Sequence, residues 1–206
     1  RLEAAIAKMY NTEIGWRIVD DTLQVRGGRG YETADSLRER GERPVPVERA
    51  LRDARINLIF EGSSEIMRLF IAREAVDHHF KLAFPIVSPQ SSLGQRVHAA
   101  VHALPFYAAW YPMLWVPRVG KFGEFGRLGR HLRFAERRAR KLGRVLFHAM
   151  VRFGPALERK QAVRFRGVEI GAELGAMSVA WVHAHDEAKR GHAGALALAD
   201  VFWREV

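Results

Sequence analysis

The sequence contains no cysteine, which excludes disulfide bonds and metal sites built from cysteine. It has no apolar run of about 18 residues, the length that a membrane-spanning helix needs. No segment alternates apolar and polar residues for long enough to predict a strand. Residues 1–12 are amphipathic and do not read as a signal peptide, which favours a cytoplasmic location. The 206 residues are 48% hydrophobic, enough to bury a sizeable core. Because helical periodicity is present and no strand pattern persists, the sequence predicts an all-α protein.

The chain starts as if inside a helix. Residues 1–8 carry no cap residue and no initiator methionine. We therefore expect a C-terminal fragment of a longer protein. The excess of Arg over Lys, 27 to 6, is typical of a GC-rich bacterial genome.

Helical periodicity and helix-end signals divide the first part of the chain. Apolar residues at helical spacing predict a helix over 2–26, which Gly27 and Gly28 end. The Gly-, Arg- and Pro-rich stretch 29–45 predicts a loop, and Pro46 suits the first turn of a short helix over 46–54. Ser63 and Ser64 are cap residues for a further helix.

Prolines and serines over 82–95 predict a linker between two domains, 1–81 and 96–206. Helices are expected over 96–109, 127–153, 155–185 and 194–205, with a Pro- and Gly-rich break over 110–123. The histidine pairs 78–79 and 183–185 do not face one common point, so no metal site is expected.

The net charge of +10 lies entirely in the second part of the chain. Residues 1–81 hold 14 basic and 14 acidic residues, whereas 118–166 alone hold 15 basic residues against Glu124, Glu136 and Glu158. A block of this kind indicates an anionic partner, such as a membrane surface, nucleic acid, CoA phosphates or an acidic protein face. A merely solvated helix face explains it equally well.

One short run, Ile59 to Arg68, places Glu61 and Gly62 between an apolar stretch and an amphipathic helix. A carboxylate desolvated from one side gains a raised pKa, which suits a general base. The glycine would let a ligand touch the backbone. In the alternative reading, Glu61 merely stabilises the start of the helix through its dipole.

The segments upstream of Glu61 favour its role as a general base. The run Gln24-Val25-Arg26-Gly27-Gly28-Arg29-Gly30-Tyr31, then Pro46-Val47-Glu48-Arg49, Arg52-Asp53-Ala54-Arg55 and Glu61-Gly62, resembles in this order the C-terminal helical domain of the acyl-CoA dehydrogenase family. The resemblance covers about residues 2–80. Arg52 and Asp53 are expected to form a structural ion pair.

The resemblance implies FAD-dependent oxidation of a fatty acyl-CoA between Cα and Cβ. It implies Glu61 as the base, with its backbone N–H on the thioester carbonyl, and Gly62 along the thioester. It implies flavin contacts from Ser63 and Glu65. Gln24, Val25, Arg26, Gly27 and Gly28 would approach the FAD of a neighbouring subunit, which implies a homo-oligomer, a dimer or larger. Electron-transfer flavoprotein is the expected electron acceptor, and the fragment alone is expected to be inactive.

The second domain looks like the extra helical domain of very-long-chain acyl-CoA dehydrogenases, which suggests a long-chain substrate. Trp110, Tyr111, Trp115 and Phe122, followed by Arg118, Lys121, Arg127 and Arg130, have the composition of a peripheral membrane anchor. The alternatives are that these aromatics form core or oligomer contacts, and that the domain serves only in oligomerisation. Nucleic-acid binding is the minor alternative, because no groove-reading motif is present.

Overall fold

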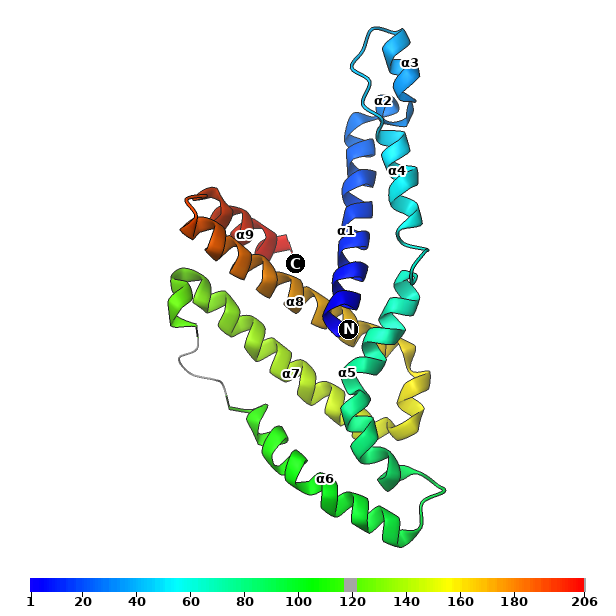
Figure 1. Ribbon diagram of the computed structural model, residues 1–206, viewed down its shortest axis with the longest axis vertical. Helices are drawn as coiled ribbons and strands as arrows, with labels where there is room; N and C mark the ends of the chain where they lie inside the picture. Colours follow the sequence, from blue (N-terminus) through cyan, green and yellow to red (C-terminus); the bar gives the residue numbers. More distant parts are fainter. Residues whose placement is uncertain (117–121, 206) are drawn as a thin grey trace. The chain divides into compact units, whose positions relative to one another are not determined.

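The computed structural model describes residues 1–116 and 122–205, without the side chains of Arg127, Arg204 and Glu205. Every regular element in these ranges is a helix (Figure 1), which confirms the all-α prediction. The contacts group the chain into two units, Arg1–Ile71 and Ala72–Val206.

The first unit is built on a pair of antiparallel helices. Helix α1 (Leu2–Arg26) lies beside α4 (Val47–Ile56) (Figure 1), with Met9 and Val47 buried. Helix α1 ends where Gly27 adopts a φ of 58°, a left-handed conformation that glycine accepts without strain. The predicted helix 2–26 is therefore confirmed, and the helix predicted over 46–54 is confirmed to within two residues at each end.

The predicted loop 29–45 is wrong in its interior, since it contains two short helices. These are α2 (Gly28–Tyr31) and α3 (Ala34–Glu39). The Thr33 hydroxyl caps α3 by accepting a hydrogen bond from the Ser36 N–H at 3.2 Å. Local capping of this kind outweighs the glycine and arginine content that favoured a loop.

Helix α5 (Ser64–Val87) begins in the first unit and continues into the second. The Ser63 hydroxyl accepts a hydrogen bond from the Ile66 N–H at 3.4 Å, which confirms the predicted cap. The helix passes through Pro85 and ends only at Val87.

The stretch predicted as a linker, 82–95, is therefore helical at both ends, and only 88–92 joins two helices. Helix α6 (Leu93–Met113) starts with a capping box, in which Ser92 and Gln95 exchange side-chain to backbone hydrogen bonds. It also continues through Pro105 and Pro112, so 110–113 is helical and the predicted break begins later. The division into domains 1–81 and 96–206 stays a prediction.

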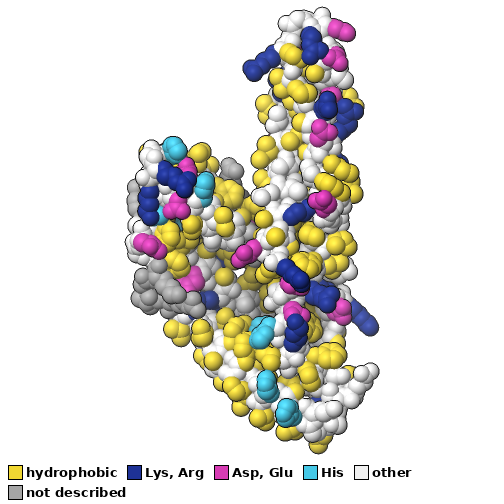
Figure 2. Space-filling view, viewed as in Figure 1, with side chains coloured by type: hydrophobic (Ala, Val, Ile, Leu, Met, Phe, Trp, Pro, Cys, Tyr) yellow, Lys and Arg dark blue, Asp and Glu magenta, His cyan; other side chains and the backbone are white. Residues whose placement is uncertain are grey.

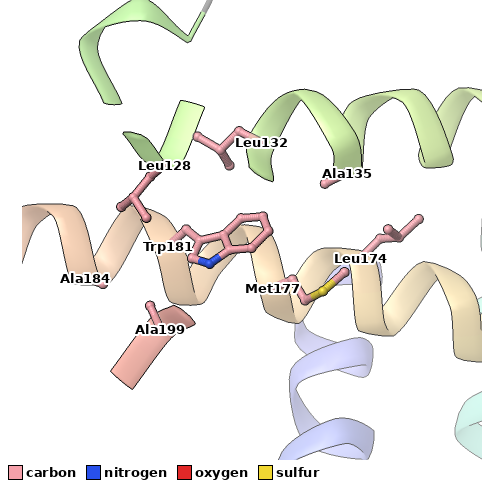
Figure 3. Close-up of a cluster of buried hydrophobic side chains, with 8 residues drawn as sticks. All are labelled: Leu128, Leu132, Ala135, Leu174, Met177, Trp181, Ala184 and Ala199. Carbon is pink, nitrogen blue, oxygen red and sulfur yellow. The ribbon is translucent and has the colours of Figure 1, made fainter. Parts of the chain in front are cut away.

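The second unit has its core between three helices and a short 3₁₀ segment. These are η1 (Gly123–Leu128), α7 (Gly129–Phe153), α8 (Gln161–Lys189) and α9 (Gly194–Glu205), with η2 (Gly154–Arg159) joining α7 to α8. Trp181 of α8 is 0% exposed and packs with Leu132 of α7 and Ala199 of α9 (Figure 3). The helices predicted over 127–153 and 194–205 are confirmed to within two residues. The helix predicted over 155–185 is shifted, since 154–159 is a 3₁₀ helix and the α-helix runs over Gln161–Lys189.

Helix α6 packs through aromatic rings. His79 of α5 lies 4.5 Å from Trp110 of α6, and Trp110 lies 5.6 Å from Phe147 of α7, measured between ring centroids. Aromatic pairs at such distances add stability beyond the area they bury. None of the helices in the described ranges combines the length and apolar character needed to cross a membrane.

Candidate functional site

The Glu61–Gly62 pair lies in the loop between α4 and α5, at a sharp backbone turn. Glu61 has a φ of 52° and is the one residue other than glycine with a positive φ in the described chain. Gly62 follows with a φ of 97°. A side-chain-bearing residue in this region is strained by about 1–2 kcal/mol, and such strain is found often at functional sites.

Lys8 of α1 bridges this loop. Its ammonium donates hydrogen bonds to the backbone oxygen of Asn57 at 2.9 Å and to that of Gly62 at 2.6 Å. The loop is thereby attached at both ends to a helix more than 45 residues earlier in the sequence.

Glu61 itself is exposed in this chain. The one-sided desolvation expected from its apolar neighbours is not provided by the described residues, because Ile59 and Phe60 are exposed as well. Its backbone N–H has no hydrogen-bond acceptor among residues 1–116 and 122–205. Both the carboxylate and the N–H are therefore free to contact a ligand.

A hollow of about 280 Å³ lies next to this loop. Ser63, Ser64 and Glu65 line it together with Arg55 and Arg68, and Glu13, Leu58 and Ile59 complete the wall. Ser64 is 7% exposed, and its buried hydroxyl has no hydrogen-bond partner in the described chain. Since a buried polar atom without a partner is costly, this hydroxyl fits a ligand that supplies a hydrogen bond.

The charges around the hollow suit a polar ligand. The Glu65 pKa is lowered, first by a hydrogen bond from its own backbone N–H and then by the Ser63 hydroxyl, so Glu65 is ionised at neutral pH. Arg55 also lines the hollow, with its guanidinium 5.4 Å from the centre of the Trp16 ring. Such a set of hydroxyl, carboxylate and guanidinium groups can hold the sugar and phosphate groups of a dinucleotide.

Arg68 fixes the first turns of α5 against α1. Its guanidinium donates to both carboxylate oxygens of Glu13, at 2.7 and 3.0 Å. Because both side chains are mostly buried, this two-fold contact sets the orientation of the α5 N-terminus that carries Ser63 and Glu65.

The second set of predicted site residues lies elsewhere, at the C-terminal end of α1. Gln24, Val25, Gly27 and Gly28 are exposed, and Arg26 is half-buried. Gln24 comes sixteen positions after Lys8, which at a rise of 1.5 Å per residue places it about 24 Å away along the helix. One chain therefore does not bring the two sets together.

Two glycines in this region have different structural roles. A Cβ on Gly30 would lie 2.7 Å from the backbone oxygen of Leu23, so α2 packs on α1 only with glycine there. A Cβ on Gly28 would meet no atom within 4 Å. Gly28 thus leaves open space beside an exposed backbone, as a ligand contact requires.

The expected ion pair between Arg52 and Asp53 is wrong. Arg52 pairs with Glu48 at 2.8 Å, and Asp53 pairs with Arg49 at 3.8 Å, each one turn back along α4. Neighbouring residues on a helix point to different sides, whereas residues four apart share a side.

The sequence analysis missed Lys8 and Glu13. Both act on residues about 50 positions away, so no local spacing links them to the loop. The one available signal was the presence of charged residues on the helix face that also carries buried Ala5 and Met9.

The residues predicted to form a membrane anchor lie in different environments, some packed inside the second unit and some exposed. Trp110 packs between α5 and α7, and Phe122 packs against the core of the second unit. Trp115 is 59% exposed and carries the Arg144 guanidinium 4.2 Å above its ring. Arg130 is exposed and Tyr111 is half-buried, while Arg118, Lys121 and the side chain of Arg127 lie outside what is described.

Comparisons with known proteins agree with the resemblance. Residues 1–76 match the family model described as acyl-CoA dehydrogenase, C-terminal domain. A protein named probable acyl-CoA dehydrogenase FadE10 from Mycobacterium tuberculosis is 54% identical over 194 residues, which cover 92% of this chain and 29% of that protein. The mitochondrial very long-chain specific acyl-CoA dehydrogenase of Homo sapiens is 43% identical over 72 residues, 35% of this chain and 10% of the human protein.

These matches confirm the predicted resemblance to the C-terminal part of this family. The chain spans about 29% of the length of the mycobacterial relatives, and the match to them extends over both units.

Proposed function

We propose that the chain supplies the catalytic base of a FAD-dependent fatty acyl-CoA dehydrogenase, on the premise that residues 1–76 match the family model of the acyl-CoA dehydrogenase C-terminal domain. The observation that carries the proposal is the Glu61–Gly62 turn, held in a strained conformation beside the hollow that Ser63, Ser64 and Glu65 line. A long-chain substrate is part of the proposal.

Glu61 acts by removing a proton. Its carboxylate takes the proton from Cα of the acyl thioester, and the proton stays on the carboxyl group. As negative charge develops on the thioester oxygen, the unpaired Glu61 N–H donates a hydrogen bond to it. Gly62 is proposed to lie along the thioester through its backbone, while a Cβ at this position would overlap the Met67 methyl carbon.

FAD fits the donor set of the hollow. When bound, FAD would supply the acceptor for the hydride from Cβ. On this chain, Ser63 and Glu65 are the proposed flavin-side contacts, and the buried Ser64 hydroxyl offers the hydrogen bond that lacks a partner. Electron-transfer flavoprotein is the proposed acceptor of the electrons.

A homo-oligomer is part of the proposal, and the geometry of α1 supports it. The α1 residue that lines the hollow is Glu13, which lies eleven positions, or about 16 Å of helix at 1.5 Å per residue, before Gln24. The lining of the hollow therefore does not include Gln24, Val25, Arg26, Gly27 or Gly28. We propose that they contact the FAD of a neighbouring subunit in a homodimer or larger homo-oligomer. A cytoplasmic location and inactivity of the chain by itself remain predictions.

The test is a Glu61→Gln variant of the full-length enzyme. We expect it to bind FAD normally and to lose flavin reduction by acyl-CoA, because an amide cannot accept the proton. The decrease in flavin absorbance after anaerobic mixing of enzyme and acyl-CoA gives the rate of flavin reduction. A Glu39→Gln variant, which changes an exposed glutamate of α3, should react like the wild type. Flavin reduction retained in Glu61→Gln would refute the assignment.

An anionic membrane surface is a second proposed partner, through α6 and α7. Residues 78–123 contain neither Asp nor Glu. Leu93, Val97, Val101 and Leu104 are exposed at helical spacing on α6, and the four exposed cations Arg130, Arg133, Arg137 and Lys141 of α7 have no ion-pair partner in the described chain. Exposed apolar residues on one helix and unpaired cations on the following helix are the two kinds of side chain that bind an anionic membrane interface.

Flotation with anionic liposomes tests this partner. Val101→Asp with Leu104→Asp should abolish binding, since both side chains are 66% exposed on the stripe. The matched control places Asp at Val179 and Leu198, which are equally exposed on α8 and α9. Salt-dependent binding to DNA without binding to liposomes would favour nucleic acid instead, and binding to neither would favour a role in oligomerisation alone.

A further inference from the structure

Lys8 contacts the loop only through its main chain. The ammonium bonds to the backbone oxygens of Asn57 and Gly62, at 2.9 and 2.6 Å, and is half-buried between them. Because Lys8 is 49 and 54 positions from these two residues, its hydrogen bonds are tertiary contacts and not a local helix cap.

The two oxygens need this partner. No backbone N–H in the described residues donates to either of them. Asn57 is the C-cap of α4, where the carbonyl groups carry the negative end of the helix dipole. A lysine ammonium with three donors satisfies both oxygens and places positive charge where the helix end favours it.

The turn between these two oxygens needs an external constraint. Glu61 has a φ of 52°, a conformation that its side chain disfavours and that persists only when the surroundings enforce it. Lys8 holds Asn57 before the turn and Gly62 within it. Releasing Gly62 would let Glu61 relax toward negative φ, which redirects both its carboxylate and its N–H.

We propose that Lys8 is a positioning residue for the reaction assigned to Glu61. The proposal rests on the proposed function. Lys8 bonds to the Gly62 carbonyl, fixes the strained conformation of Glu61, and thereby aligns the base and the N–H donor with the acyl thioester. It acts through the loop and touches neither substrate nor flavin.

The experiment uses the full-length enzyme with three variants: Lys8→Met, Lys8→Arg and the control Lys81→Met. Lys81 is an exposed lysine of α5 that pairs with Asp77 at 2.5 Å. Hydrogen exchange of the amides of 57–63 reports the loop directly, without any reaction. We expect at least about tenfold faster exchange in Lys8→Met, since each charged hydrogen bond lost produces about that change and the variant loses two, and no change in the control.

The second readout is the rate of flavin reduction per bound FAD. We expect Lys8→Met to lower it about 10- to 100-fold, as a misplaced catalytic group does, while FAD content and acyl-CoA affinity stay near the wild-type values. Lys8→Arg keeps a cation and should restore part of the rate. If Lys8→Met does not fold, Lys8→Arg alone must show an intermediate loss.

Two results overturn the proposal. Unchanged exchange in 57–63 would show that Lys8 does not fix the loop. Faster exchange with an unchanged flavin reduction rate would show that the fixed loop does not matter for the reaction. Failure of the proposed function itself is recognised separately, because Glu61→Gln would then retain flavin reduction.

Discussion

Arg68 and Glu13 form a two-fold hydrogen-bonded ion pair, with distances of 2.7 and 3.0 Å between nitrogen and carboxylate oxygen. The pair connects the start of α5 with the middle of α1. Because it is mostly shielded from water, it contributes more than the usual surface ion pair.

Replacing Glu13 with Gln should destabilise the first unit. The change removes the carboxylate charge from the two-fold contact with the Arg68 guanidinium, and we expect a loss of about 2 kcal/mol in the free energy of unfolding. Urea unfolding measures this loss. Glu74→Gln, at a half-buried glutamate of α5, is the matched control and should shift the midpoint much less. Equal midpoints for the two variants would contradict the structural role of the pair.

Replacing Gly30 with Ala should separate α2 from α1. The added Cβ would approach the Leu23 oxygen to 2.7 Å, and backbone cannot move aside as a flexible side chain can. We expect a loss of about 1–3 kcal/mol, the range for overpacking. Gly28→Ala meets no atom within 4 Å and should leave the thermal midpoint nearly unchanged. A larger effect at Gly28 than at Gly30 would contradict the packing described here.

Trp181 is the central side chain of the second unit's core. Trp181→Ala should cost about 3–5 kcal/mol, because it leaves a large cavity. Trp181→Phe should cost much less, since it keeps a ring and also removes a buried indole N–H that has no partner in the described residues. Calorimetry on both variants measures the difference, and similar costs would indicate that the indole N–H has a partner such as a bound water.

The second unit should lose stability as the pH falls. Burial, and secondarily the neighbouring His78, lower the pKa of His79 from its ordinary value of 6.5. Burial, and secondarily Arg130, also lower the pKa of His131, although Asp200 opposes this. The unfolded chain therefore takes up these protons first. The contribution of the two neutral histidines to the free energy of unfolding is fully present above pH 6.5. It declines as the pH falls from 6.5 toward their lower pKa in the folded state.

The measurement compares unfolding in urea at about pH 5 and about pH 8. His79→Phe keeps a ring among Phe106, Tyr107 and Trp110 but cannot titrate, so stability should fall less with acid than in the wild type. His98→Phe changes an exposed histidine of α6 and should preserve the wild-type pH dependence. Equal slopes for wild type and His79→Phe would contradict a contribution from His79.

The helices could be predicted where local signals are strong. Gly27 ends α1 and Ser63 caps α5 because both act within one turn of the chain. The prolines misled the prediction of the linker 82–95. Pro85, Pro105 and Pro112 lie inside α5 and α6, where packing of both helices on neighbouring rings offsets the lost backbone hydrogen bonds.

The sequence was enough to locate the candidate site, but it did not predict the contacts and backbone conformation that orient Glu61. The resemblance pointed to Glu61 and Gly62, yet nothing local indicates that Lys8 bonds to Gly62 across 54 positions. The left-handed conformation of Glu61 is likewise a consequence of tertiary contacts, because glutamate has no preference for it.

The length of α1 has a consequence for mixtures of subunits. If its two ends serve different catalytic centres, damage at Gly28 and damage at Glu61 fall on opposite halves of a shared centre. Two inactive mutant proteins, brought together in one hybrid particle, would then complement each other and regain a working centre assembled from the intact half of each.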